Sequence, residues 1–92
     1  YVFYIINALE EAASKLGLSK ELNKQIIFQT FLGSLKLQKK TKQTAYKLSN
    51  TIAIKGGTTE AGLNVMKKHN FNRIFSETLL SAYKRARKLG NK

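Results

Sequence analysis

The sequence contains no cysteine, no proline and no tryptophan, and only 5 of its 92 residues are acidic. Without cysteine the chain can form neither disulfides nor thiolate metal sites, so helix packing or association must hold it together. A monomer of this size buries only about 60–70% of the surface that its unfolded chain exposes. The composition therefore favours a single small domain, residues 1–92, that covers part of its surface with a partner.

Long hydrophobic runs are also missing. No stretch approaches the roughly 20 apolar residues of a membrane-spanning helix, and no basic segment precedes the apolar opening, residues 1–6, as a signal peptide would require. We therefore expect a soluble, cytoplasmic protein without a membrane partner. Because the first residue is not Met and the opening is already apolar, we also expect the sequence to be a piece of a longer chain.

Positive charge is abundant, with 17 Lys and Arg and a formal net charge of +12. Such a balance raises nucleic acid as a partner. Most of the cations are Lys spread over every segment, whereas specific phosphate and base recognition favours Arg. We expect a solvated basic surface and no nucleic-acid partner, and keep a basic nucleic-acid-binding helical domain as an alternative. The two basic clusters are Lys39, Lys40 and Lys42, and Lys84, Arg85, Arg87 and Lys88.

Apolar residues recur at the spacing of a helix face through most of the chain. The first helix is predicted over residues 2–16, with Gly17 after its end and Ser19 as the cap of a second helix that runs to about Gln38. This second helix is apolar around most of its circumference, so we expect it to be buried on several sides. A 92-residue monomer cannot cover such a helix, which predicts a homodimer with an interface formed by Ile27, Phe28, Phe31, Leu32 and Leu35.

A polar linker is predicted over residues 39–43, and Thr44 can cap a short helix through Leu48 or Asn50. A fourth helix is predicted to begin at Thr58 or Thr59 and end at residues 69–70. The clearest apolar stripe then runs over residues 71–90. About five helices and no convincing strand predict an all-α fold.

No catalytic set is visible in the sequence. The carboxylates are scattered over separate helices, and His69 stands alone, so neither paired acid–base chemistry nor a metal site is predicted. The stretch from Gly56 to Thr59, "GGTT", is the exception. Read alone it is either an ordinary turn and helix cap or a backbone cradle for an anion, because adjacent glycines let the backbone approach a bound group and helix N-termini attract carboxylates and phosphates.

Four ordered blocks resemble the C-terminal dimerisation domain of pyrroline-5-carboxylate reductase: "YVFYIINALEEAASKLGLSKEL", "QTFLGSLKL", "GGTTEAGL" and "FNRIFSETLLSAYKRARKLG". The resemblance spans nearly the whole chain. It implies an all-helical domain that interlocks with a second copy and follows an N-terminal dinucleotide-binding domain, absent here, that carries NADPH or NADH. The intact enzyme reduces 1-pyrroline-5-carboxylate to L-proline. This chain alone would then be inactive, and a non-catalytic helical oligomerisation module remains the other reading.

The resemblance also implies site residues. Gly56, Gly57, Thr58 and Thr59 would form the carboxylate cradle of the substrate, with the Thr59 hydroxyl close to the substrate ring. Apart from the resemblance, we expect Lys55 to add a cation beside this cradle. This domain would orient the substrate, while the cofactor transfers hydride.

The sequence departs from the family at two places. Ile54-Lys55 stands where a Ser-Pro pair is usual, which removes a polar contact and a rigid turn. Asn70 stands where the family usually has Gly before the Phe that corresponds to Phe71.

Overall fold

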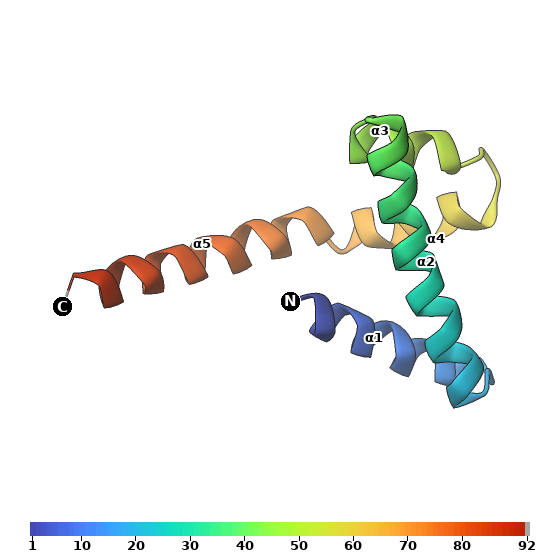
Figure 1. Ribbon diagram of the computed structural model, residues 1–92, viewed down its shortest axis with the longest axis horizontal. Helices are drawn as coiled ribbons and strands as arrows, with labels where there is room; N and C mark the ends of the chain where they lie inside the picture. The colour runs from blue at the N-terminus through green and yellow to red at the C-terminus, as the bar shows by residue number, and fades with distance from the viewer. Residues whose placement is uncertain (92) are drawn as a thin grey trace. The chain divides into compact units, whose positions relative to one another are not determined.

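The computed structural model describes residues 1–91, and this part of the chain contains five α-helices and no strand. The predicted all-α class is therefore confirmed. Figure 1 shows the helices in chain order, α1 (Val2–Lys15), α2 (Lys20–Thr41), α3 (Ala45–Ile52), α4 (Thr58–Lys68) and α5 (Phe71–Gly90).

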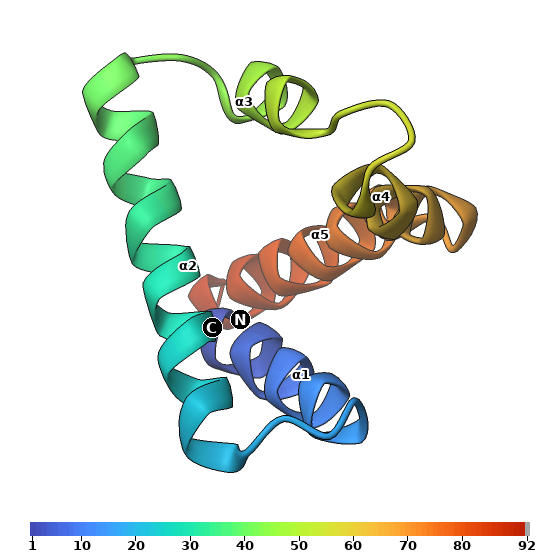
Figure 2. The ribbon, with the colours of Figure 1, turned by 90° about the vertical axis from the view of Figure 1, so that its right-hand side faces the viewer.

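The helices form two compact units, the first over residues 1–48 and the second beginning at Ser49, so that the division falls within α3. In the first unit α1 packs against α2, and in the second α4 packs against α5. Figure 2 shows the connection from α3 running into the start of α4, where the candidate site lies.

The turn between α1 and α2 follows the predicted signals. Leu16 ends α1, and Gly17 adopts a φ of +90°, a left-handed conformation that glycine takes without steric cost. Ser19 then caps α2, because its Oγ accepts a hydrogen bond from the Leu22 N–H at 3.2 Å.

A polar side chain anchors the contact between α1 and α2. Asn23 is only 2% exposed, and its Nδ2 donates to the Glu10 carbonyl O at 2.9 Å and to Ser14 Oγ at 3.4 Å. Ile27, one turn later, is 9% exposed. These two are the buried residues of α2 in the single chain. The expectation that α2 is buried on several sides concerns the dimer, and it stays a prediction.

The end of α2 differs from the prediction. The helix continues to Thr41 instead of stopping near Gln38, and residues 39–41 of the expected linker are helical. Lys and Gln are good helix formers, and cations in the last turn interact favourably with the negative end of the helix. Lys42 ends the helix in the left-handed region with a φ of 59°, and its N–H donates to the Gln38 carbonyl O at 2.9 Å.

Thr44 caps α3 as predicted, with its Oγ1 accepting from the Lys47 N–H at 3.1 Å. At the junction of α4 and α5, His69 ends α4 and Asn70 has a φ of 55° and a ψ of 48°. Asn is one of the few residues apart from Gly that visit this left-handed region readily. The departure from the family's Gly therefore leaves the turn into Phe71 intact.

Large apolar side chains remain exposed along the helices. Phe3 is 87%, Phe28 62% and Leu35 63% exposed in the single chain. Where exposed apolar side chains of this size lie together, they usually mark a protein–protein or membrane contact. Within residues 1–91 no helix combines the length and the apolar character needed to cross a bilayer.

Candidate functional site

The loop before α4 begins with a tight turn over residues 54–57. The Gly57 N–H donates to the Ile54 carbonyl O at 2.9 Å, and Gly56, the third residue of the turn, has a φ of +79°. This combination fits a type II β-turn, which requires a positive φ at its third position and therefore favours Gly there. Lys55 is the second residue, where Pro is common because its ring fixes φ. The turn thus forms without the proline that is usual in the family, and Lys55 leaves φ at this position free.

Gly57 is required for a different reason. Its φ of −88° and ψ of 175° are open to any residue, but a Cβ at this position would lie 3.0 Å from the Ile54 carbonyl O and 3.6 Å from the Ile54 Cβ. Such a contact is tighter than most that real Cβ atoms make, so the Ile54 carbonyl would have to move by a few tenths of an ångström. Gly56 is thus favoured by its φ and Gly57 by the close approach of its own loop.

The N-terminus of α4 is open. Gly57 is its N-cap and supplies no side-chain hydrogen bond, and the first helical bond runs from the Ala61 N–H to the Gly57 carbonyl O at 3.2 Å. The N–H groups of Thr58, Thr59 and Glu60 precede that bond, so the helix offers them no carbonyl acceptor. Both threonines are exposed. Unpaired N–H groups at the positive end of a helix attract carboxylates and phosphates.

Glu60 contributes a contact that the sequence analysis missed. Its Oε1 accepts a hydrogen bond from the Gly56 N–H at 3.0 Å, and its side chain is half-buried. A signal for it was present, because a Glu three residues after an N-cap often reaches back to the backbone N–H at the start of the helix. Here the side chain reaches one residue further, to the glycine before the N-cap. In the predicted cradle, the Gly56 N–H is therefore bonded to Glu60 and the Gly57 N–H to Ile54. The N–H groups of Thr58 and Thr59 are open to a ligand.

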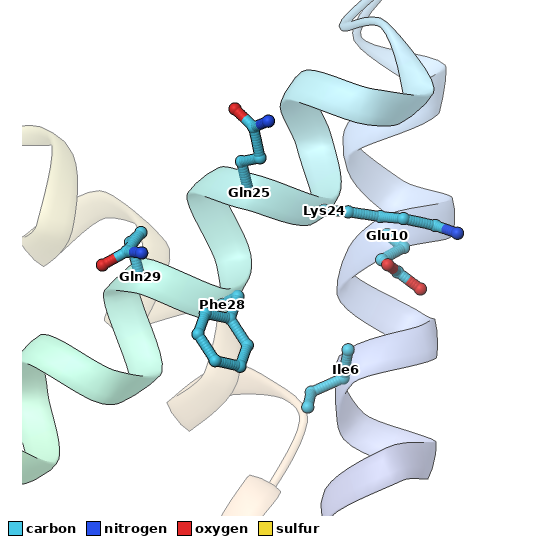
Figure 3. A pocket seen from close by; sticks show the side chains of 6 residues that line it. All are labelled: Ile6, Glu10, Lys24, Gln25, Phe28 and Gln29. Atoms are coloured by element: carbon cyan, nitrogen blue, oxygen red, sulfur yellow. The ribbon is translucent and has the colours of Figure 1, made fainter.

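A second hollow lies between α1 and α2 (Figure 3). Ile6 and Glu10 of α1 line one side, and α2 lines the other with Lys24, Gln25, Phe28 and Gln29. In Figure 3 the side chains of Ile6 and Phe28 extend into the space between the two helices. The lining combines two apolar side chains, Ile6 and Phe28, with four polar or charged ones. Within residues 1–91 no cluster of His, Cys, Asp or Glu could hold a metal ion.

The predicted interface residues of α2 lie in different environments. Ile27 is buried against α1, and Phe31 is half-buried. Phe28, Leu32 and Leu35 are exposed in the single chain. Their exposed apolar side chains are available to a partner, and their assignment to a dimer interface stays a prediction.

Comparison with known proteins gives a consistent result. The family model described as pyrroline-5-carboxylate reductase dimerisation matches residues 1–89. A pyrroline-5-carboxylate reductase of Synechocystis sp. is 33% identical over all 92 residues, which cover 34% of that protein. Pyrroline-5-carboxylate reductase 2 of Bacillus subtilis is 36% identical over 86 residues, which are 94% of this chain and 31% of that protein.

Two solved structures share the fold. A pyrroline-5-carboxylate reductase from Coxiella burnetii matches with a TM-score of 0.90 and 37% identity, over 97% of this chain and 33% of that one. A pyrroline carboxylate reductase from Plasmodium falciparum with NADP bound matches with a TM-score of 0.80 and 36% identity, over 84% of this chain and 29% of that one. The chain thus spans about a third of the length of its relatives. By its match over residues 1–89, it belongs to the family of pyrroline-5-carboxylate reductase dimerisation domains.

Proposed function

We propose that this chain is the dimerising and substrate-orienting part of a cytoplasmic, NAD(P)H-dependent pyrroline-5-carboxylate reductase, which reduces 1-pyrroline-5-carboxylate to L-proline in the last step of proline biosynthesis. The observation that carries the proposal is the open N-terminus of α4 directly after the glycine turn, in a chain of this family. Because the chain spans about a third of its relatives, the dinucleotide-binding domain would lie elsewhere in the protein. No nucleic acid or membrane takes part in this proposal.

The carboxylate cradle would hold the substrate by its anionic group. The free N–H groups of Thr58 and Thr59 and the positive end of α4 suit a carboxylate. Gly56 and Gly57 form the turn that sets the direction of those groups. Lys55 is exposed beside them and would add a positive charge. Its attraction for the substrate carboxylate would weaken as the salt concentration rises.

This chain would contribute to the reaction by orienting the substrate. The nicotinamide cofactor, when bound, supplies the hydride. Holding the substrate by its carboxylate fixes which ring atom faces the cofactor, and such fixed geometry accounts for a large part of the rate of many enzymes. The Thr59 hydroxyl would lie close to the ring and donate or accept one hydrogen bond there.

The exposed apolar faces of α2 and of the start of α1 would be covered by a second copy of the chain. Phe3, Phe28 and Leu35 are each more than half exposed, and burial of side chains of this size contributes about 1.5–3 kcal/mol each. A homodimer in which the two copies interlock uses this surface.

The activity test compares the 92-residue chain with the protein in its full natural sequence. The chain alone is expected to bind no NADPH or NADH and to oxidise neither, because its described part is all-helical and has no strand–turn–helix unit to hold a pyrophosphate. The full sequence is expected to oxidise one of the two cofactors when 1-pyrroline-5-carboxylate is added, which absorbance of the reduced nicotinamide measures.

Three results would count against the proposal. Oxidation by the 92 residues alone would show that the chemistry is misplaced. A full-length protein that forms a stable dimer and binds the cofactor, yet turns over no substrate, would be a non-catalytic oligomerisation module. Binding to nucleic acid that falls steeply with salt would favour the basic-domain alternative.

A further inference from the structure

Glu60, a partly buried residue whose carboxylate accepts the Gly56 N–H, has no part in the proposed function. We propose that Glu60 is a positioning residue: by accepting the Gly56 N–H it holds the glycine turn so that the N–H groups of Thr58 and Thr59 stay open to the substrate carboxylate. This inference rests on the proposed function.

The turn has few other restraints. One backbone hydrogen bond closes it, from the Gly57 N–H to the Ile54 carbonyl O at 2.9 Å. Lys55 lacks the ring by which a proline would fix φ. The 3.0 Å bond from the Gly56 N–H to Glu60 Oε1 is a second tie, and it joins the turn directly to the first turn of α4. Because the acceptor is a carboxylate, this bond is stronger than one between neutral groups.

Together with the turn's own hydrogen bond, this bond keeps the two glycine N–H groups from competing for the ligand. The Gly56 N–H is held by Glu60 and the Gly57 N–H by Ile54, so a bound carboxylate meets only the N–H groups at the start of α4. The site would therefore take a ligand that presents one compact anionic group along the helix axis.

An opposite role for Glu60 makes a different prediction. If its negative charge mainly repelled the anionic substrate, then Glu60→Gln would lower the KM, because the charge is gone while the shape remains. If Glu60 positions the loop, Glu60→Gln keeps an acceptor for the Gly56 N–H and changes the KM little. Glu60→Ala removes the acceptor, so we expect the KM to rise about tenfold while kcat stays nearly unchanged. This pattern indicates that substrate binding is weakened equally in the ground state and in the transition state.

Glu21 provides a matched control. It is also a first-turn glutamate, near the N-terminus of α2, where Ser19 is the cap. Glu21→Ala loses the same favourable interaction with the positive end of a helix, but Glu21 has no role in the glycine loop. A general effect of losing a helix-start carboxylate would therefore appear in both alanine variants.

The experiment measures KM, kcat and residue-specific amide exchange in the full natural sequence for the wild type and the three variants. We expect the Gly56 amide to exchange about tenfold faster in Glu60→Ala, and at nearly the wild-type rate in Glu60→Gln and Glu21→Ala. Faster exchange without a rise in KM would overturn the proposal, as would an unchanged exchange rate or a lower KM in Glu60→Gln.

The two proposals fail in different ways. If the wild type turns over no 1-pyrroline-5-carboxylate, the proposed function fails, and with it the role of Glu60 toward the substrate. The exchange of the Gly56 amide then still reports whether Glu60 holds the turn. If the wild type is active and Glu60→Ala matches it in KM, only the role of Glu60 is overturned.

Discussion

Leu35→Asp is expected to leave the chain unable to form a folded dimer. In the single chain Leu35 is 63% exposed, so an aspartate there would cost an isolated monomer little. In a dimer whose second copy covers this face of α2, the same aspartate would be an unpaired buried charge, which costs several kcal/mol. Because so small a chain has little stability to lose, we expect unfolding or aggregation, measured as loss of the helical circular-dichroism signal and of the dimer mass.

Lys36→Asp is the control for this variant. Lys36 is the next residue on α2 and is exposed, and its side chain points about 100° away around the helix. The substitution changes the charge by more than Leu35→Asp does, yet we expect helical content and dimer mass to stay close to those of the unchanged chain. A folded dimer in Leu35→Asp would show that this face of α2 is not the interface, and a folded, helical monomer would show that folding does not depend on the dimer.

Gly57→Val is expected to remove nearly all turnover from the full-length protein. A Cβ at position 57 already approaches the Ile54 carbonyl O to 3.0 Å, so we expect the branched valine to open the turn and to move the N–H groups of Thr58 and Thr59. A displacement of about 1 Å in substrate position can cost roughly 100-fold in rate. Steady-state kinetics, with the dimer mass checked for each variant, measures the effect.

Thr59→Val tests the contact with the ligand without changing the turn. It removes the hydroxyl and keeps the N–H and the shape of the side chain, so we expect a loss of about 1–3 kcal/mol in the apparent barrier for one hydrogen bond. Lys55→Ala is expected mainly to raise the KM. If Gly57→Val keeps its turnover in an intact dimer, the carboxylate cradle is only a turn and helix cap.

Local signals predicted most of the fold. Gly17, Ser19 and Thr44 mark helix ends in the sequence, and each has the predicted role in the structure. Such signals depend on a few neighbouring residues, so they can be recognised without knowledge of the tertiary structure. The end of α2 was not predicted because Lys42, which ends it, takes a left-handed conformation, and a lysine in the sequence does not indicate that conformation.

Tertiary contacts explain the other misses. Asn23 is buried because its partners lie 9 and 13 residues away on another helix, and no local pattern indicates that pairing. Glu60 was passed over as one of several scattered carboxylates, although its spacing from Gly57 could have indicated a contact with the start of α4. The sequence also does not reveal how close the backbone of Ile54 lies to Gly57.

The mass of the unchanged 92-residue chain in solution is the most direct test of the homodimer, because the exposed apolar faces of α1 and α2 are assigned to a second copy. Light scattering after gel filtration at micromolar concentration is expected to give twice the chain mass of 10.4 kDa. A stable, soluble and helical monomer of 10.4 kDa under those conditions would contradict it.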